Sequence, residues 1–171
     1  MNGMAAPQGD GLTEAAAELF ACARTHAITI GTAESCTGGM VASSLASLPG
    51  VSEVFKGAVI SYANEVKTAL LGVEADTLSK EGAISEEVAL QMAEGARAAL
   101  MVDFAVSTTG IAGPDGGSEG KPVGTVWIAV AGKGKRSATL HHFSGTRNEI
   151  RQAATKAALQ NLSQFIQMWV G

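Results

Sequence analysis

The 171-residue chain has few aromatic residues (5%) and few charged ones (16%), although 46% of its residues are hydrophobic. This composition is typical of a globular protein, because a disordered chain has low hydrophobicity and high charge. Alanine and glycine are abundant, so we expect a core of small aliphatic side chains, which suits helices packed closely on a sheet. The length corresponds to one domain that can bury a core of its own.

The sequence also has few basic residues, few cysteines and no long apolar run, and each of these shortages argues against a class of protein. Lys and Arg number 12 against 16 Asp and Glu, and the net charge of −4 argues against a surface that binds nucleic acid. The two cysteines, Cys22 and Cys36, form neither a metal-binding spacing nor a secreted disulfide framework. No apolar run reaches the length that spans a membrane, and the small, polar N-terminus is unlike a signal peptide. The sequence therefore predicts a soluble, cytoplasmic protein.

The order of predicted elements indicates the fold class. Residues 1–11 have no periodicity and are expected to form a disordered tail. Residues 12–171 then alternate predicted helices with predicted strands and include one hairpin at a sheet edge, which predicts a single α/β domain. We expect a three-layer α/β/α sandwich around a mostly parallel, five-stranded mixed sheet with one antiparallel strand. The strands are expected at about 27–33, 55–62, 104–108, 124–131 and 136–143. The helices are expected at about 13–26, 40–48, 65–71, 85–101, and from a capping box at 146–149 to about 167.

The turn between the first predicted strand and the second predicted helix reads Thr32-Ala33-Glu34-Ser35-Cys36-Thr37-Gly38-Gly39. Backbone N–H groups at a helix start are unpaired and partly positive, so they can bind an anion or the oxyanion formed when Ser35 attacks a carbonyl. The alternative is an N-cap serine followed by small residues that pack closely. Cys36 is a second candidate nucleophile, but no histidine is placed to serve a thiol, which favours Ser35.

A second segment holds a candidate base. Tyr62 ends a predicted strand, Asn64 is the expected helix cap, and Lys67 lies in the first turn of the helix that follows. The positive end of a helix disfavours a cation and so lowers the pKa of a lysine there, and burial would lower it further. A neutral lysine can act as general base for a serine, and a tyrosine between them could relay the proton. An exposed lysine beside a half-buried tyrosine is the alternative.

The third segment is a glycine-rich loop from Thr109 to Gly120. Glycines allow the backbone to approach a ligand, and successive N–H groups in such turns form anion-binding hollows. The loop matches neither known phosphate motif, and a flexible loop without a ligand is the alternative. Lys121 and Arg147 could add positive charge beside it or remain on the surface as solvated side chains.

These three segments follow the carboxyl ends of predicted parallel strands, where ligands gather in sheets of this kind. Their coincidence favours one shared site. A metal site is not expected there, since Asp115 and the scattered glutamates show no ligand spacing. His141 and His142 are adjacent in a predicted strand and therefore point to opposite faces.

The same segments resemble the CinA C-terminal family. The similarity lies in residues 32–39, in Tyr62-x-Asn64-Glu65-x-Lys67, and in Gly110-Ile111-Ala112-Gly113-Pro114-Asp115-Gly116-Gly117 followed by Lys121-Pro122-Val123-Gly124-Thr125-Val126. It runs from about residue 12 to 167. Some family members carry an additional N-terminal pyrophosphatase-type domain, and this chain looks like the stand-alone form.

The enzymes characterised in that family are nicotinamide-nucleotide amidases. The resemblance implies hydrolysis of nicotinamide mononucleotide to nicotinic acid mononucleotide and ammonia, without a cofactor, in pyridine-nucleotide recycling. It implies that Ser35 attacks the amide carbon while Lys67, aided by Tyr62, accepts the serine proton. Backbone N–H groups of the turn residues Cys36, Thr37 and Gly38 would hold the oxyanion. Contacts to the nucleotide are expected from Thr109, Gly110, Ala112, Gly113 and Arg147.

Two other interpretations stay open. The family name derives from competence and DNA-damage induction, so a nucleotide-binding or protein-interaction module without turnover is one of them. The other is an amidase that acts on a different nucleotide or amide. Intact Ser35, Tyr62 and Lys67 favour an enzyme. We expect no membrane partner and no direct nucleic-acid partner, whereas the Ala-rich helices are compatible with a homo-oligomer.

Overall fold

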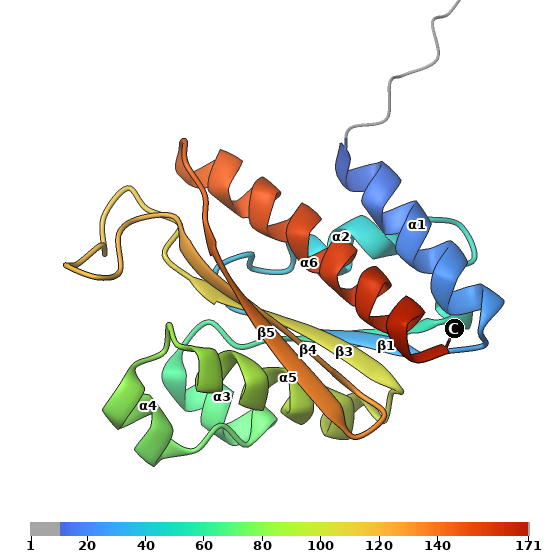
Figure 1. Ribbon diagram of the computed structural model, residues 1–171, viewed down its shortest axis with the longest axis horizontal. Coiled ribbons are helices and arrows are strands. Elements are labelled where there is room, and N and C mark those ends of the chain that lie inside the picture. The colour runs from blue at the N-terminus through green and yellow to red at the C-terminus, as the bar shows by residue number, and fades with distance from the viewer. Residues whose placement is uncertain (1–10, 171) are drawn as a thin grey trace, which may run out of the picture.

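A computed structural model describes residues 11–170 and contains a five-stranded sheet between two layers of helices (Figure 1). The strands are β1 (Ile30–Glu34), β2 (Phe55–Ile60), β3 (Phe104–Gly110), β4 (Thr125–Gly132) and β5 (Lys135–His142). Their order across the sheet is β2-β1-β3-β4-β5. Strand β1 pairs in parallel with β2 and β3, while β4 pairs antiparallel with both β3 and β5. The predicted mixed sheet is confirmed, and β4 is its reversed strand.

Helices lie on both faces of the sheet (Figure 1). On one face lie α1 (Gly11–Thr25), α2 (Met40–Ala46) and α6 (Arg147–Val170). On the other lie α3 (Asn64–Leu71), α4 (Ala75–Glu81) and α5 (Glu86–Leu100), and a 3-10 turn, Val51–Glu53, precedes β2. The predicted tail lies outside the described residues except for Gly11, which begins α1. Within residues 11–170, none of the helices combines the length and apolarity needed to cross a bilayer.

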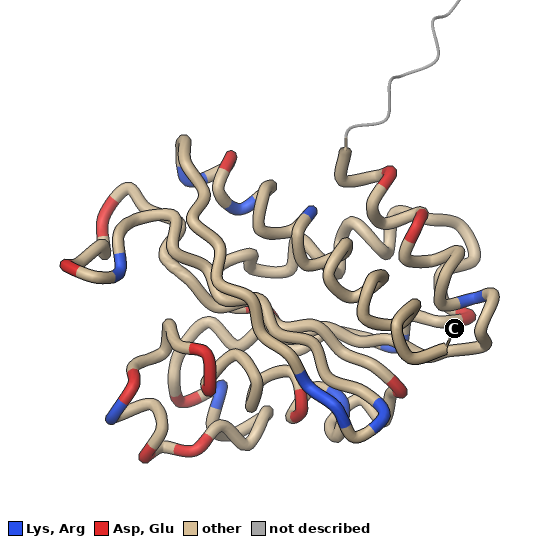
Figure 2. Tube along the Cα trace, in the orientation of Figure 1, with Lys and Arg blue, Asp and Glu red and all other residues tan. Residues whose placement is uncertain are grey.

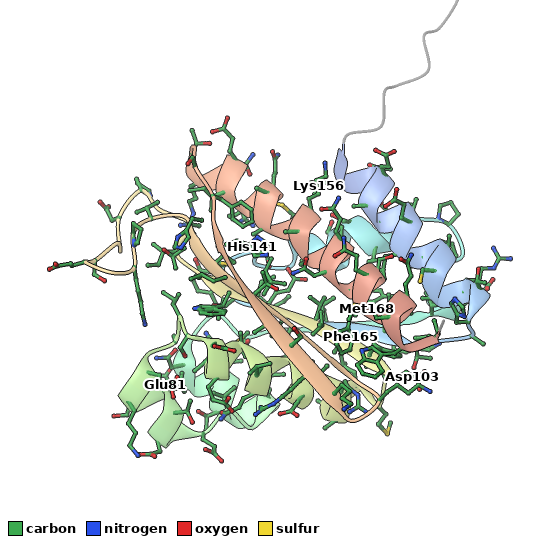
Figure 3. All side chains as sticks on the ribbon, viewed as in Figure 1. Glu81, Asp103, His141, Lys156, Phe165 and Met168 are labelled. Carbon is green, nitrogen blue, oxygen red and sulfur yellow. The ribbon has the colours of Figure 1, made fainter. Side chains whose placement is uncertain are left out.

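The core consists mainly of small aliphatic side chains, as the composition predicts. The largest cluster lies between the sheet and helices α1, α2 and α6 and includes Phe165 (Figure 3). The Phe165 ring meets the Phe104 ring edge to face, with centroids 6.0 Å apart. Charged residues gather on the helices and at the β4–β5 turn, and the middle of the described sheet is almost free of them (Figure 2). Apolar burial therefore holds both helix layers on the sheet.

Local sequence signals account for the starts of helices α5 and α6. At the start of α6 the backbone N–H of Thr146 donates to Glu149 at 2.7 Å, and the N–H of Glu149 donates to the Thr146 hydroxyl at 3.3 Å. This reciprocal pair is the predicted capping box. Ser85 caps α5 by accepting from the N–H of Val88. The expected cap of α3 is wrong: Asn64 is its first helical residue, and the N-cap position holds Ala63, which makes no side-chain bond.

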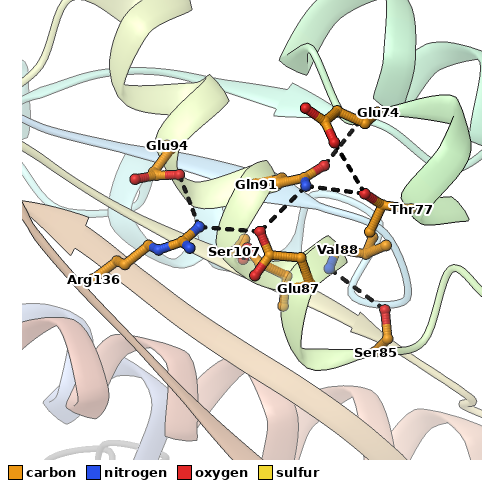
Figure 4. A network of polar contacts seen from close by, with 10 residues as sticks. Glu74, Thr77, Ser85, Glu87, Val88, Gln91, Glu94, Ser107 and Arg136 are labelled. Carbon is orange, nitrogen blue, oxygen red and sulfur yellow. Dashed lines mark hydrogen bonds and ion pairs between the residues drawn. The ribbon is translucent and has the colours of Figure 1, made fainter. Parts of the chain in front are cut away.

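Helix α4 is not among the elements predicted from the sequence. Contacts with another helix hold it in place, and such contacts leave no pattern in its own residues. Only Thr77 of its residues is buried, so no apolar stripe marks it in the sequence. Gln91 of α5 holds α4 by two hydrogen bonds (Figure 4). Its amide oxygen accepts from the N–H of Glu74 at 2.9 Å, and its amide nitrogen donates to the Thr77 hydroxyl at 3.2 Å. On the other side of the same network, Arg136 of β5 reaches Glu87 and Glu94 of α5.

Gly95 sets the distance between α3 and α5. A Cβ atom at this position would overlap the backbone carbonyl of Leu71, the last residue of α3, and backbone cannot move aside cheaply. Since α3 carries Lys67, this close packing also places the candidate base.

We expect Gly95→Ala to destabilise the protein by about 1–3 kcal/mol through overpacking, measured by urea unfolding. Intrinsic helix propensity acts in the opposite direction, because alanine is favoured over glycine by about 1 kcal/mol. Ala98→Gly, on the exposed side of α5, measures that propensity term in the same helix. A Gly95→Ala protein more stable than the wild type would show that α3 and α5 are not in close contact here.

Candidate active site

The three segments singled out in the sequence meet at the carboxyl ends of β1, β2 and β3. Ser35 follows β1 directly, and its backbone N–H donates to the carbonyl of Thr108 in β3 at 3.0 Å. The N–H of Ser61, just after β2, donates to the carbonyl of Glu34 at 2.8 Å. Because parallel strands end at the same edge of a sheet, the topology brings these loops together.

Ser35 and Lys67 are in direct contact. The Lys67 amine (Nζ) lies 3.2 Å from the Ser35 hydroxyl oxygen (Oγ), 2.8 Å from the carbonyl of Ser61 and 3.2 Å from the carbonyl of Tyr62. Lys67 is only 1% exposed, and burial lowers the pKa of its amine from the ordinary value of 10.5. A neutral amine has two N–H donors and one lone pair, so the two carbonyls can take both donors while the lone pair faces the serine hydroxyl.

The proton-relay hypothesis places the Tyr62 side chain between Ser35 and Lys67, but the Tyr62 hydroxyl bonds Arg147 instead. Tyr62 is 58% exposed, and its hydroxyl accepts a hydrogen bond at 2.8 Å from Arg147 at the start of α6. Strand β2 ends at Ile60, so Tyr62 lies in the loop beyond it instead of ending the strand. Tyr62 contacts Lys67 through its backbone carbonyl, and the Ser35–Lys67 contact needs no side chain between them.

Arg147 links two of the three loops. One guanidinium nitrogen reaches Tyr62, and the other donates to the carbonyl of Gly113 in the glycine-rich loop at 2.7 Å. The guanidinium therefore lies between the loop after β2 and the loop after β3. Of the predicted nucleotide contacts, Arg147 and Gly113 are together at this place.

The other predicted contacts in this loop have structural partners or are buried. The hydroxyl of Thr109 donates to the carbonyl of Ala83 at 2.7 Å. Gly110 is the last residue of β3 and pairs with Val126, and Ala112 is 5% exposed. Lys121, near the loop tip, donates to the carbonyl of Glu81 in α4 at 3.0 Å.

Glu34 is a site residue that the sequence analysis did not single out. Its carboxylate is fully buried beside Ser35 and accepts hydrogen bonds from three backbone N–H groups and two hydroxyls. The donors are Gly39 N (2.9 Å), Val41 N (3.1 Å), Ala42 N (2.8 Å), Thr37 Oγ1 (2.7 Å) and Thr32 Oγ1 (3.2 Å). The start of α2, which the sequence offered to an external anion, is thus occupied by the chain's own carboxylate.

The predicted oxyanion donors of the turn differ in their hydrogen bonds. The N–H of Gly38 donates to the carbonyl of Ser35 at 3.0 Å, so this predicted donor is engaged. Within residues 11–170, the N–H groups of Cys36 and Thr37 donate to no backbone carbonyl, but both point toward the Cys36 sulfur and act to lower the pKa of that thiol. Arg151 of α6, also missed in the sequence, donates to the carbonyls of Cys36 (3.2 Å) and Thr37 (2.9 Å). In a trans peptide the N–H points opposite the carbonyl, so Arg151 fixes the direction of the Thr37 N–H.

Cys36 is poorly suited to act as nucleophile. It is 5% exposed, and burial raises the pKa of its thiol to about 11, with the Glu34 carboxylate acting in the same direction. The thiol stays protonated near neutral pH, and the thiolate is the reactive form. This favours Ser35, in line with the sequence-based preference.

Comparisons with known proteins agree on one family. A family model described as the CinA C-terminal domain matches residues 12–166. The chain is 48% identical over 146 residues to the nicotinamide-nucleotide amidohydrolase PncC of Escherichia coli strain K12, a match that covers 84% of this chain and 88% of that protein. It is 46% identical over 138 residues to a CinA-like protein of Fervidobacterium nodosum, covering 81% of this chain and 34% of that longer relative.

A solved structure extends the agreement to the fold. The competence/damage-inducible protein CihA from Agrobacterium tumefaciens has a TM-score of 0.89 and 37% identity, and the match covers 96% of this chain and 99% of that one. The family model spans nearly all described residues, including β1 to β3 and the three loops that follow them. The chain therefore belongs to the CinA C-terminal domain family.

Proposed function

We propose that this protein is an amidohydrolase that converts nicotinamide mononucleotide to nicotinic acid mononucleotide and ammonia. The observation that carries the proposal is the buried contact between the Ser35 hydroxyl and the Lys67 amine. The name of the E. coli relative, a nicotinamide-nucleotide amidohydrolase, supports the substrate class. The contact supplies a nucleophile and a base at hydrogen-bond distance, which an acyl-transfer reaction needs.

In the first step, neutral Lys67 accepts the hydroxyl proton of Ser35 while the serine oxygen attacks the carboxamide carbon. The carbonyl oxygen becomes negative and receives hydrogen bonds from the N–H groups of Cys36 and Thr37. Such donors matter because they are already oriented when the charge forms, and removing one typically costs about 2.7–4 kcal/mol of barrier. The carbonyls of Ser61 and Tyr62 stabilise the lysine in its protonated state.

In the second step, the Lys67 ammonium gives its proton to the amide nitrogen. The C–N bond breaks, ammonia leaves, and an ester joins the nicotinoyl group to Ser35. Water then attacks this ester while Lys67 accepts the water proton. Cleavage of the ester releases the carboxylic acid product, and the proton returns to the serine oxygen.

The substrate phosphate is assigned to Arg147. Its guanidinium is exposed between Tyr62 and Gly113, and its planar set of donors fits a phosphate group. The N-terminus of α2 is not available for this role, because Glu34 already occupies it. Tyr62 serves in this scheme as the partner that orients Arg147, and its backbone carbonyl serves Lys67.

The alternative of a binding module without turnover explains less. Burying an amine that carries a charge in water is unfavourable, and a module that only binds has no use for a buried lysine against a serine.

We propose a cytoplasmic location from the substrate class and the two free cysteines, Cys22 and Cys36. Self-association stays a prediction.

Ser35→Ala is expected to lower kcat by on the order of 10³-fold or more, since no other group can form the acyl-enzyme. The measurement is ammonia release from nicotinamide mononucleotide, with circular dichroism to verify folding. Ser47→Ala is the matched control, because it removes an exposed hydroxyl just after α2. Turnover by Ser35→Ala close to that of the wild type would rule out the serine mechanism.

The pH dependence tests the base. Lys67 must be neutral to accept a proton, so kcat/KM is expected to rise with pH as the amine deprotonates. Because burial lowers the pKa of Lys67, the midpoint of this rise should lie below 10.5. Lys67→Arg, which keeps its proton at every accessible pH, should be inactive throughout. A wild-type profile with its midpoint at or above 10.5 would contradict the assignment.

Arg147→Ala tests the phosphate contact. The variant is expected to lose about tenfold or more in kcat/KM for nicotinamide mononucleotide, since a charge-assisted contact to phosphate is worth about 1.5–3 kcal/mol. Its kcat/KM for nicotinamide riboside, which lacks the phosphate, should change by less than about threefold. Equal losses on both substrates would show that Arg147 acts on the site as a whole and does not bind the phosphate.

A further inference from the structure

Glu34 carries a full set of hydrogen bonds at a position next to the nucleophile. The residue is 0% exposed, and both carboxylate oxygens accept from more than one donor. Three of the donors are backbone N–H groups at the start of α2, where the helix dipole favours an anion. In the described part of the chain no Lys or Arg pairs with this carboxylate. The helix start therefore supplies its counter-charge.

A chain of hydroxyls joins this carboxylate to β3. The Thr37 hydroxyl donates to Glu34 at 2.7 Å and also lies 2.7 Å from the hydroxyl of Thr108. Because a hydroxyl has one proton, a Thr37 that donates to Glu34 receives its second bond from Thr108. The turn that holds Ser35 is thus fastened at Thr37 between β3 and the start of α2.

The fastened residue is also part of the proposed oxyanion hole. Thr37 lies two residues after Ser35, and its backbone N–H is one of the two donors assigned to the substrate oxygen. A shift of the turn would move the serine oxygen and this N–H together. Displacements of about 1 Å in such groups can lower a rate on the order of 100-fold.

We propose that Glu34 and Thr37 are positioning residues for the amide hydrolysis, a role that rests on the proposed function. The Glu34 carboxylate occupies the helix start and receives the Thr37 hydroxyl. It thereby holds Ser35 and the N–H groups of Cys36 and Thr37 in reactive geometry. Neither side chain touches the substrate. The interaction acts through the turn, so its loss should affect kcat and leave KM nearly unchanged.

Thr37→Val and Thr32→Val form a matched pair for the test. Both residues are 0% exposed, and each donates one hydroxyl to Glu34, but only Thr37 lies on the Ser35 turn. Both variants should lower the melting temperature by a few degrees, as expected for loss of a buried hydrogen bond, and Thr37→Val by more because its hydroxyl also bonds Thr108. Thr37→Val should lower kcat by about 10- to 100-fold with KM within about twofold, and Thr32→Val should change kcat by less than about threefold. Thr37→Ser, which keeps the hydroxyl, should restore most of the lost kcat.

A second readout separates this proposal from the proposed function. The rate at which a sulfonyl fluoride modifies Ser35, followed by mass spectrometry, reports on the nucleophile without any nucleotide. Thr37→Val should slow the modification by about tenfold or more, and Thr32→Val should not. Equal kcat and labelling rates in the two valine variants would overturn the positioning role, whatever the substrate. Labelling that differs between them in a protein that releases no ammonia would retain the positioning role and reject the amide substrate. A wild-type protein that neither labels nor turns over would reject both.

Discussion

The Lys67 amine has almost no contact with water, and the rest of the site depends on how it is held. Two backbone carbonyls, from Ser61 and Tyr62, accept from it, and the Ser35 hydroxyl occupies the remaining direction. Desolvation favours the neutral form of the amine, and this form is the one that can take a proton from serine. The carbonyls in turn stabilise the ammonium once the proton has moved. One buried side chain can therefore serve as base and then as acid.

The fold supplies the constraint that makes this contact possible. Strands β1 and β2 run in parallel and end at the same edge, which places the Ser35 turn beside the loop that carries Ser61 and Tyr62. Helix α3 begins just after this loop, so Lys67 in its first turn lies at the same edge, and the close packing of α3 on α5 at Gly95 fixes its position. The start of α2 supports the same turn from the other side through Glu34. Charges are thus separated: the buried carboxylate lies at α2 and the exposed guanidinium of Arg147 faces the proposed phosphate position.

Much of this arrangement follows from local sequence. Alternating helix and strand patterns predict the three layers, the capping box at Thr146 predicts the start of α6, and the hydroxyl-rich turn predicts where chemistry occurs. What sequence could not supply depends on contacts between distant residues. Helix α4 is held by Gln91, which lies outside it, and Arg151 reaches the Ser35 turn from more than 100 positions along the chain. Glu34 matches no capping pattern, because its carboxylate reaches N–H groups five to eight residues ahead. The direction of the Tyr62 side chain depends on β2 ending at Ile60 and on Arg147, which no periodicity reveals.

The most direct test of the central claim is a titration of the Lys67 amine itself, by NMR of its 15Nζ or 13Cε resonance assigned by comparison with Lys67→Met. The buried contact with Ser35 predicts a midpoint below the ordinary lysine value of 10.5, and a signal that shifts in Ser35→Ala because the hydroxyl partner is gone. A Lys67 resonance that titrates with a midpoint at or above 10.5, and whose chemical shift is the same in Ser35→Ala, would contradict the proposal that this lysine is the base.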